Sequence, residues 1–124
     1  MIKVTRKLVV YTIKPDYITD YCHRLLKEFR EQIIQLPGCL AYETLSDTDN
    51  QDVFADIVTW ASMQQARNAE QIIHHKKQHS TQDCFKMFDE IMLFKYFSPL
   101  SDWCNFDLVA HQEPFEQQPV KLTG

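Results

Sequence analysis

The sequence predicts an α+β fold, with elements in the order β-α-β-β-α-β and a four-stranded antiparallel sheet. Two observations carry this prediction. Residues 39–45 and 53–60 have the character of two strands joined by the polar turn 46–52. The second of these strands is apolar in both alternating sets, and such a strand is normally covered on both faces. A chain of 124 residues has enough helix to cover one face, so we expect an identical subunit to cover the other.

The first two elements are a strand within residues 2–13 and a helix over about 17–35. The strand alternates weakly and is stopped by Pro15, which has no backbone donor for the ladder. Asp16 is the expected N-cap of the helix. The helical apolar residues recur every three or four positions and form one stripe: Ile18, Tyr21, Cys22, Leu25, Phe29, Ile33 and Leu36.

The second half of the chain is predicted to contain a second helix, a further helical turn and the fourth strand. Ser62 and Gln65 have the spacing of a capping box, which predicts a short helix after the third strand. A further helical turn is expected from position 80 or 81, and residues 91–97 have the pattern of the fourth strand. Right-handed crossovers then lead to a ferredoxin-like arrangement, with both helices on one face of the sheet.

The prolines after the fourth strand divide the chain into a domain of residues 1–98 and a tail of residues 99–124. The tail contains large apolar residues, which a free linker seldom has. We therefore expect residues 100–110 to dock on the domain or on a partner, and residues 116–124 to be loose.

Composition excludes several classes of function. The formal charge is −4 and the basic residues form no long run, which argues against nucleic-acid binding. Two glycines are too few for a phosphate loop or a dinucleotide fingerprint. The N-terminal apolar run is too short for a signal peptide or a membrane span. The four cysteines are widely spaced, as in reduced thiols of a cytoplasmic protein.

Asp56 is the most conspicuous acid, because it lies in the middle of an apolar strand. Burial there would raise its pKa and allow it to act as a base or to orient a histidine. The alternative is that Asp56 meets an arginine such as Arg67, or faces a wet cavity. Tyr11, Tyr42, Phe54, Trp60, Phe85 and His75 are the candidate residues for lining an apolar binding pocket. Trp60 and the tyrosines have an ordinary structural interpretation as well, in the core and bonded to nearby carbonyls.

The segment 74–79 contains three histidines, of which His75 and His79 have the i, i+4 spacing of zinc ligands on one helical face. A metal would need a third ligand such as Asp83 or Asp56, and the intervening lysines disfavour a cation. No metal site is therefore predicted. His79 is the candidate general base, because histidine is the usual side chain for proton transfer near neutral pH; the alternative is an exposed residue favoured by the helix C-terminus.

Residues 36–43 (LPGCLAYE), residues 53–66 (VFADIVTWASMQQA) and the histidine at position 79 together resemble the antibiotic biosynthesis monooxygenase domain. The resemblance covers residues 4–97 and implies a dimeric α/β barrel. Members of that family include cofactor-independent monooxygenases of polyphenols and quinols, haem-degrading enzymes, a sugar-phosphate isomerase and proteins without known activity.

The sequence departs from two patterns in that family. Haem-degrading members have an asparagine and a tryptophan where this chain has Leu8 and Ala69, although their histidine matches His79. Many members also have a glutamate at the position of Val58, and Asp56 is the nearest acid on the same face. The first departure argues against haem degradation. The second departure has two interpretations: Asp56 replaces the missing glutamate, or this chain has no equivalent acid.

The sequence thus favours a homodimeric monooxygenase that uses no metal or flavin and acts on an aromatic or quinol-like molecule. His79 would deprotonate the substrate, with Asp56 as helper, because the anion is the better electron donor to oxygen. Two alternatives remain: a non-catalytic domain that binds an apolar small molecule in the same pocket, and an assembly unit that uses its tail as a contact. Neither nucleic acid nor a membrane is an expected partner.

Overall fold

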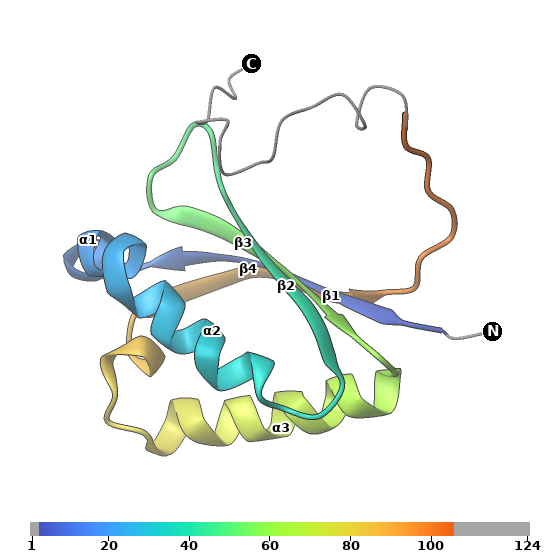
Figure 1. Ribbon diagram of the computed structural model, residues 1–124. Coiled ribbons are helices and arrows are strands. Elements are labelled where there is room, and N and C mark those ends of the chain that lie inside the picture. The colour runs from blue at the N-terminus through green and yellow to red at the C-terminus, as the bar shows by residue number, and fades with distance from the viewer. Residues whose placement is uncertain (1–2, 106–124) are drawn as a thin grey trace.

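The computed structural model describes residues 3–105 of the chain (Figure 1). Its sheet has four strands in the order β2-β3-β1-β4, and every neighbouring pair is antiparallel. The strands are β1 (Thr5–Ile13), β2 (Cys39–Ser46), β3 (Val53–Trp60) and β4 (Phe88–Phe97). The predicted α+β fold class and element order are confirmed, and β4 begins three residues earlier than expected.

The first helical region runs without a break through four short elements: η1 (Pro15–Tyr17), α1 (Ile18–Asp20), the π-helical turn η2 (Tyr21–Leu25) and α2 (Leu26–Ile34). Asp16 lies inside the first turn and is not its cap, because Pro15 already occupies the first helical position. The π turn is closed by the Leu26 N–H, which donates to the carbonyl of Tyr21. Its first residue, Tyr21, contacts the buried hydroxyl of Tyr11.

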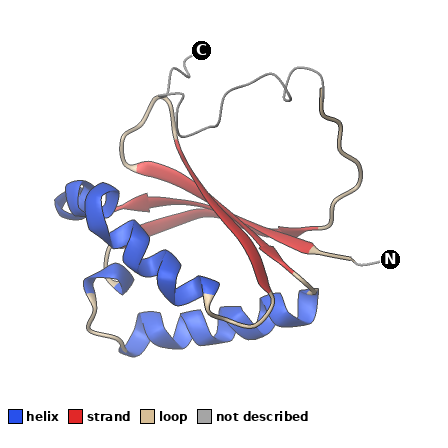
Figure 2. Ribbon diagram, in the orientation of Figure 1, coloured by secondary structure: helices blue, strands red, loops and turns tan. Residues whose placement is uncertain are grey.

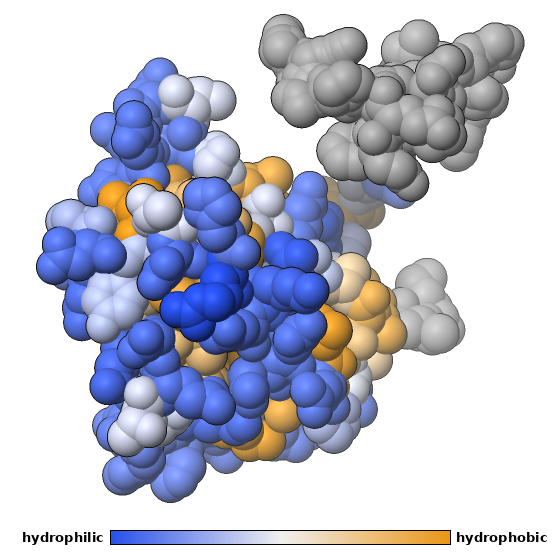
Figure 3. Space-filling view, turned by 60° about the vertical axis from the view of Figure 1, so that its left-hand side comes forward, coloured by the Kyte–Doolittle hydropathy of each residue, from blue (hydrophilic) through white to orange (hydrophobic). Residues whose placement is uncertain are grey.

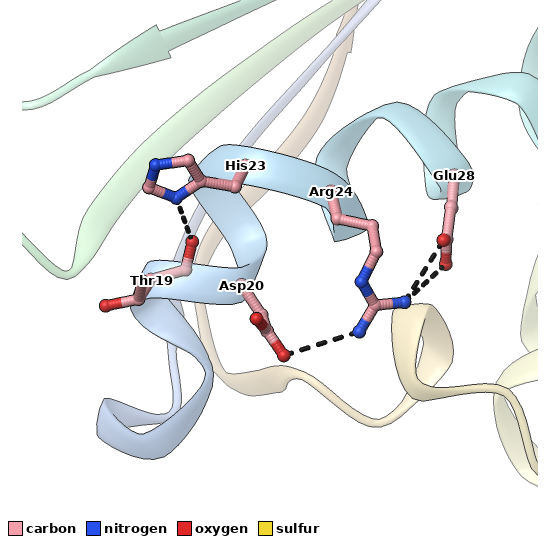
Figure 4. A network of polar contacts seen from close by, with 5 residues as sticks. All are labelled: Thr19, Asp20, His23, Arg24 and Glu28. Atoms are coloured by element: carbon pink, nitrogen blue, oxygen red, sulfur yellow. Dashed lines mark hydrogen bonds and ion pairs between the residues drawn. The ribbon is translucent and has the colours of Figure 1, made fainter.

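The solvent side of this region carries a small ionic network (Figure 4). Arg24 reaches Asp20 at 3.3 Å on one side and Glu28 at 3.1 Å on the other, and the His23 ring contacts the Thr19 carbonyl at 2.8 Å. Each of these pairs is four residues apart. Exposed pairs of this kind contribute little to stability, because water screens the charges. The region is therefore held mainly by its buried face.

The second helix, α3 (Met63–His79), is one continuous element. The Ser62 hydroxyl accepts a hydrogen bond from the Gln65 N–H at 3.1 Å, so the predicted cap is confirmed. The helix runs through the three histidines and ends at His79, which agrees with the expected position of His79 at a helix end, but it is longer than the short helix expected. A 3₁₀ turn, η3 (Asp83–Phe85), leads from α3 to β4.

Two tight connections flank β2. Gly38 has φ +90°, a left-handed conformation in which a Cβ would lie 2.5 Å from the Gln65 side chain. The β2–β3 turn is held by Asp47, whose Oδ1 accepts from the backbone N–H groups of Asp49 and Asn50. The expected polar turn thus bonds its own backbone, as residues of this type commonly do.

Both helices lie on one side of the sheet (Figure 2). The core between the two layers is apolar and includes Ile13, Leu25, Ile33, Trp60 and Ile73. In β3 the residues that face the helices are buried, whereas the intervening ones are only half-buried. Hydrophilic residues dominate the view in Figure 3, and apolar residues appear there in separate patches. The sheet therefore has one covered face and one open face.

The described part of the tail follows β4. Leu100 and Trp103 are 98% and 83% exposed, so they do not pack on the domain of this chain. Docking on a partner stays a prediction. The rest of the predicted tail, residues 106–124, lies outside the described residues.

Candidate functional site

A cavity of about 310 Å³ opens between the helices and the covered face of the sheet. That volume is at the small end of the range for ligand sites, about 300–1,000 Å³. The lining comes from both layers of the fold: Lys7, Val9, Tyr11, Phe29, Ile33, Tyr42, Asp56, Val58, Glu70, Ile73, His74, Lys77, Phe88, Ile91 and Phe94. Most of these side chains are apolar or aromatic, and the polar ones are few.

Asp56 lies at the centre of the sheet, opposite Val9 of β1 and Thr44 of β2. Only 5% of this residue is exposed. Its Oδ1 accepts hydrogen bonds from the hydroxyls of Tyr11 at 2.8 Å and Thr44 at 2.9 Å. Its Oδ2 accepts one from the Tyr42 hydroxyl at 2.6 Å. The carboxyl is therefore fixed by three hydroxyls from two neighbouring strands.

A fourth hydroxyl extends this network into the helical layer. The hydroxyls of Tyr11 and Tyr21 are in hydrogen-bond contact, and Tyr21 is the first residue of the π turn. Because Tyr11 donates its proton to Asp56, Tyr21 is the donor in this contact. Burial, followed by the charge of Asp56, raises the pKa of both phenols well above the usual value. Both tyrosines therefore stay protonated near neutral pH and act as donors.

Burial also raises the pKa of Asp56, while the hydrogen bonds from Tyr42, Tyr11 and Thr44 act in the opposite direction. Desolvation is the larger influence. A carboxyl with a raised pKa in an apolar cavity is better matched to proton transfer near neutral pH than an ordinary aspartate. Its Oδ2 accepts only the Tyr42 hydroxyl among the described residues, so it retains acceptor capacity toward the cavity.

Four further polar residues line the cavity. The Lys7 Nζ forms an ion pair with Glu70 at 2.8 Å, and it lies 5.2 Å from the centre of the Phe94 ring. Lys77 and His74 come from the last turns of α3. Burial lowers the pKa of Lys77. The site thus combines an apolar interior with both acidic and basic groups.

The structure brings three of the predicted site residues into the cavity lining: Asp56, Tyr11 and Tyr42. Phe54, Trp60 and Phe85 are buried but do not line it. Phe54 packs behind the site on Tyr11 and Tyr21, with ring centroids 6.2 and 4.5 Å away. Phe85 supports the lining residue Phe29 at 5.5 Å. Trp60 is 1% exposed and belongs to the core.

His75 and His79 do not line the cavity either. Both are exposed on α3, and their rings lie 4.4 Å apart. The continuous helix turns this pair toward solvent and places His74 at the cavity instead. Within residues 3–105, no group of three or more His, Cys, Asp or Glu side chains is arranged to hold a metal ion.

Sequence reasoning missed Tyr21, Lys7, Glu70 and Lys77 as parts of the site. A signal existed for Lys7, because it alternates with Thr5, Val9 and Tyr11 in the buried set of β1. Glu70 and Lys77 are seven residues apart, with Ile73 between them, and so share one face of α3. The contact between Tyr21 and Tyr11 had no sequence signal, since it depends on the packing of helix on sheet.

Comparison with known proteins finds a matching family and structures of the same fold. Residues 6–81 match the model of a family described as antibiotic biosynthesis monooxygenase. No curated protein matches the chain. No helix within residues 3–105 has the length and apolar character needed to cross a membrane.

Several solved structures share the fold. A candidate antibiotic biosynthesis monooxygenase from Nitrosomonas europaea has 16% identity and a TM-score of 0.57, with 80% of this chain and 90% of that chain covered. A conserved protein of unknown function from Bacteroides thetaiotaomicron, described as a possible oxidoreductase, has 17% identity and a TM-score of 0.58, with 79% and 99% covered. A protein from Methanosarcina mazei has 14% identity and a TM-score of 0.53, with 82% and 95% covered. At these identities the likeness shows the fold alone.

Proposed function

The chain belongs to the antibiotic biosynthesis monooxygenase family, and we propose that it is a cofactor-independent monooxygenase of an aromatic or quinol-like small molecule. The observation that carries the proposal is a buried carboxyl in an aromatic-lined cavity. Asp56 is held there by three hydroxyl donors, and burial raises its pKa. This combination supplies a base with few competing water molecules.

The proposed reaction begins with transfer of a proton from a substrate hydroxyl to Asp56. The resulting anion gives electrons to O₂ more readily than the neutral phenol does. A dihydroxy-aromatic then gains one oxygen atom and becomes a hydroxyquinone, and the second oxygen atom leaves as water with two hydrogens from the substrate. The substrate supplies all four electrons, so atoms and electrons balance without an external reductant.

The tyrosines have separate roles in this proposal. Tyr11 and Tyr42 hold the carboxyl oriented and stabilise its negative charge before the substrate binds. Tyr21 holds Tyr11 in turn, and so acts as a positioning residue. The rings of Phe29, Phe88 and Phe94 line the cavity and match a planar substrate. The same cavity supports the alternative of a non-catalytic domain that binds an aromatic molecule.

The proposal includes a homodimer formed through the open face of the sheet. Apolar residues occupy that face on every strand, among them Leu8 and Val10 of β1, Ile57 of β3 and Leu93 of β4. A second copy would cover them and close the two sheets into a barrel. The cavity lies on the opposite, helical side, so each subunit would keep its own site.

The decisive experiment measures O₂ uptake with a panel of hydroquinones, catechols and polycyclic phenols. Asp56→Asn keeps the size of the side chain but removes the base, and we expect uptake to fall at least about tenfold, as loss of a general base does. Asp89→Asn, an exposed acid on β4, is the matched control and retains the wild-type rate.

His79→Ala tests the other candidate base in the same assay. A rate that falls with His79→Ala and not with Asp56→Asn would return the base role to His79. No uptake by the wild type with any substrate, combined with measurable binding of the same phenols, would favour the binding domain over the enzyme.

A further inference from the structure

The ammonium group of Lys77 lines the cavity, and the charges of Glu70 and Asp56 act on it without a contact. Its Nζ lies 4.4 Å from the centre of the Phe88 ring, and it makes no hydrogen bond or ion pair with any other residue in the described part of the chain. Lys77 is only partly exposed. A cation withdrawn from water and left with an aromatic face alone remains available to an incoming anion.

The other charged groups of the cavity are already occupied. Lys7 is paired with Glu70 at 2.8 Å, so these two charges compensate each other. The Asp56 carboxyl accepts hydrogen bonds from three hydroxyl groups. Of the remaining polar lining residues, His74 is exposed on the same helix. Lys77 is therefore the partly buried charged group of the lining that has no hydrogen-bond or ion-pair partner within residues 3–105, while the charges of Glu70 and Asp56 act on it without a contact.

Two aromatic rings connect Lys77 with the Asp56 cluster. The Phe88 ring beneath the ammonium lies 5.4 Å from the Tyr11 ring, in an edge-to-face arrangement. The Tyr11 hydroxyl in turn donates to Asp56 at 2.8 Å. A planar molecule whose anionic group contacts Lys77 can therefore pack its ring against Phe88 and Tyr11 and reach Asp56 with its other end. The cavity volume of about 310 Å³ limits such a molecule to a few fused rings.

We propose that the substrate of this site is an aromatic carboxylate, and that Lys77 binds its carboxylate group while the ring extends along Phe88 and Tyr11 toward Asp56. A carboxylate would supply the direct ionic partner that Lys77 lacks among the described residues. The inference names the substrate class of the proposed oxygenase and rests on that function for the reaction, but the binding of the carboxylate is independent of any turnover.

The test compares 2-naphthoate with its neutral analogue 2-naphthamide by isothermal titration calorimetry. Wild type is expected to bind the acid about tenfold more tightly than the amide, the size of one charge-assisted hydrogen bond. Lys77→Gln removes this preference and leaves the affinity for the amide unchanged. Lys76→Gln is the matched control, because Lys76 is the adjacent residue on α3, donates to Gln32 at 2.9 Å and does not line the cavity.

Lys77→Arg keeps the charge and serves as a second variant. It retains the preference for the acid if the charge is what binds, even if Lys77→Gln folds poorly. Equal affinities of wild type for acid and amide overturn the inference, as does a preference that survives in Lys77→Gln or the absence of binding by both probes.

The experiments distinguish a failure of the carboxylate subsite from a failure of the proposed oxygenase activity. An acid preference without O₂ uptake from any hydroxylated aromatic acid supports the carboxylate subsite and overturns the oxygenase. O₂ uptake from neutral phenols, without an acid preference, overturns the subsite and supports the oxygenase.

Discussion

Asp56 is an acid at the centre of a sheet, where burying a charged carboxylate lowers stability and a neutral residue would not. The structure offsets part of that cost with the hydroxyls of Tyr11, Tyr42 and Thr44. Within residues 3–105 no cation is in hydrogen-bond contact with the carboxyl, and burial still raises its pKa. A residue of this kind is retained for its chemistry more often than for stability.

The raised pKa predicts how stability depends on pH. Between 3.8, the ordinary value, and the higher folded-state pKa, the folded chain holds a proton that the unfolded chain has released. The contribution of Asp56 to the unfolding free energy therefore falls as pH rises through this window, by about 1.4 kcal/mol per unit of pKa elevation. Asp56→Asn does not titrate, so wild type should lose stability relative to this variant as pH rises.

Urea unfolding of both proteins from about pH 3.5 to pH 8 measures the difference. Asp47→Asn provides a control of opposite sign. Backbone N–H groups of the turn lower the pKa of Asp47, so its contribution is present above the ordinary pKa and is lost as pH falls through the folded-state value. A constant difference between wild type and Asp56→Asn across the range would contradict the raised pKa.

At the level of the elements, periodicity predicted where helices and strands lie better than it predicted where they end. The predicted cap at Ser62 is present, and the turn around Asp47 bonds its own backbone. The length of α3 was underestimated because the polar run 74–79 has little apolar periodicity of its own. Its last turns are helical nonetheless, and they carry His74 and Lys77 to the cavity. The rotation of these last helical turns about the helix axis decides which histidine faces the cavity.

Gly38 lies in the tight connection between α2 and β2. Gly38→Ala would introduce a side chain at φ +90° and bring its Cβ within 2.5 Å of the Gln65 side chain. We expect a loss of unfolding free energy of about 1–2 kcal/mol from the backbone alone, with crowding in addition. The measurement is urea unfolding, monitored by circular dichroism.

Repeating Gly38→Ala in a Gln65→Ala background separates the two causes, because that background removes the crowding and leaves the backbone strain. If the loss disappeared entirely in this background, the positive φ would not be the cause. A loss that persists at about the backbone value supports the left-handed conformation.

On the scale of the whole molecule, the sheet is covered on one side only. Among the outward-facing apolar residues, Leu45 is 45%, Leu93 is 38% and Phe97 is 49% exposed in the single chain. Monomeric proteins seldom leave an extensive apolar face in water. Within the described residues neither helix covers this face, so the geometry predicts a second copy there.

Light scattering coupled to size-exclusion chromatography should give twice the chain mass of 14.7 kDa. Leu93→Lys places a charge on the open face and is expected to yield the monomer. Ile72→Lys is the control, because Ile72 is 40% exposed but lies on α3, and it should leave the dimer intact. A monomeric wild type, or a dimer unaffected by Leu93→Lys, would contradict this assembly.

The amino-acid sequence by itself determined the fold class, the order of the elements and the two-sided character of β3. These properties follow from short-range patterns: alternation in strands, a repeat of three to four in helices, and caps and turns with specific side chains. Asp56 was recognisable for the same reason, as the one acid in an otherwise apolar strand.

Only the tertiary structure decided which side chains form the site. The Asp56 cluster draws Tyr11 from β1, Tyr42 from β2 and Tyr21 from the π turn, which are distant in sequence and meet through sheet register and helix packing. The same packing turned His75 and His79 outward and brought Lys77 to the cavity. A sequence pattern shows which face of an element is apolar, but it does not show how one element is rotated against the next, and that rotation decides which polar residues meet.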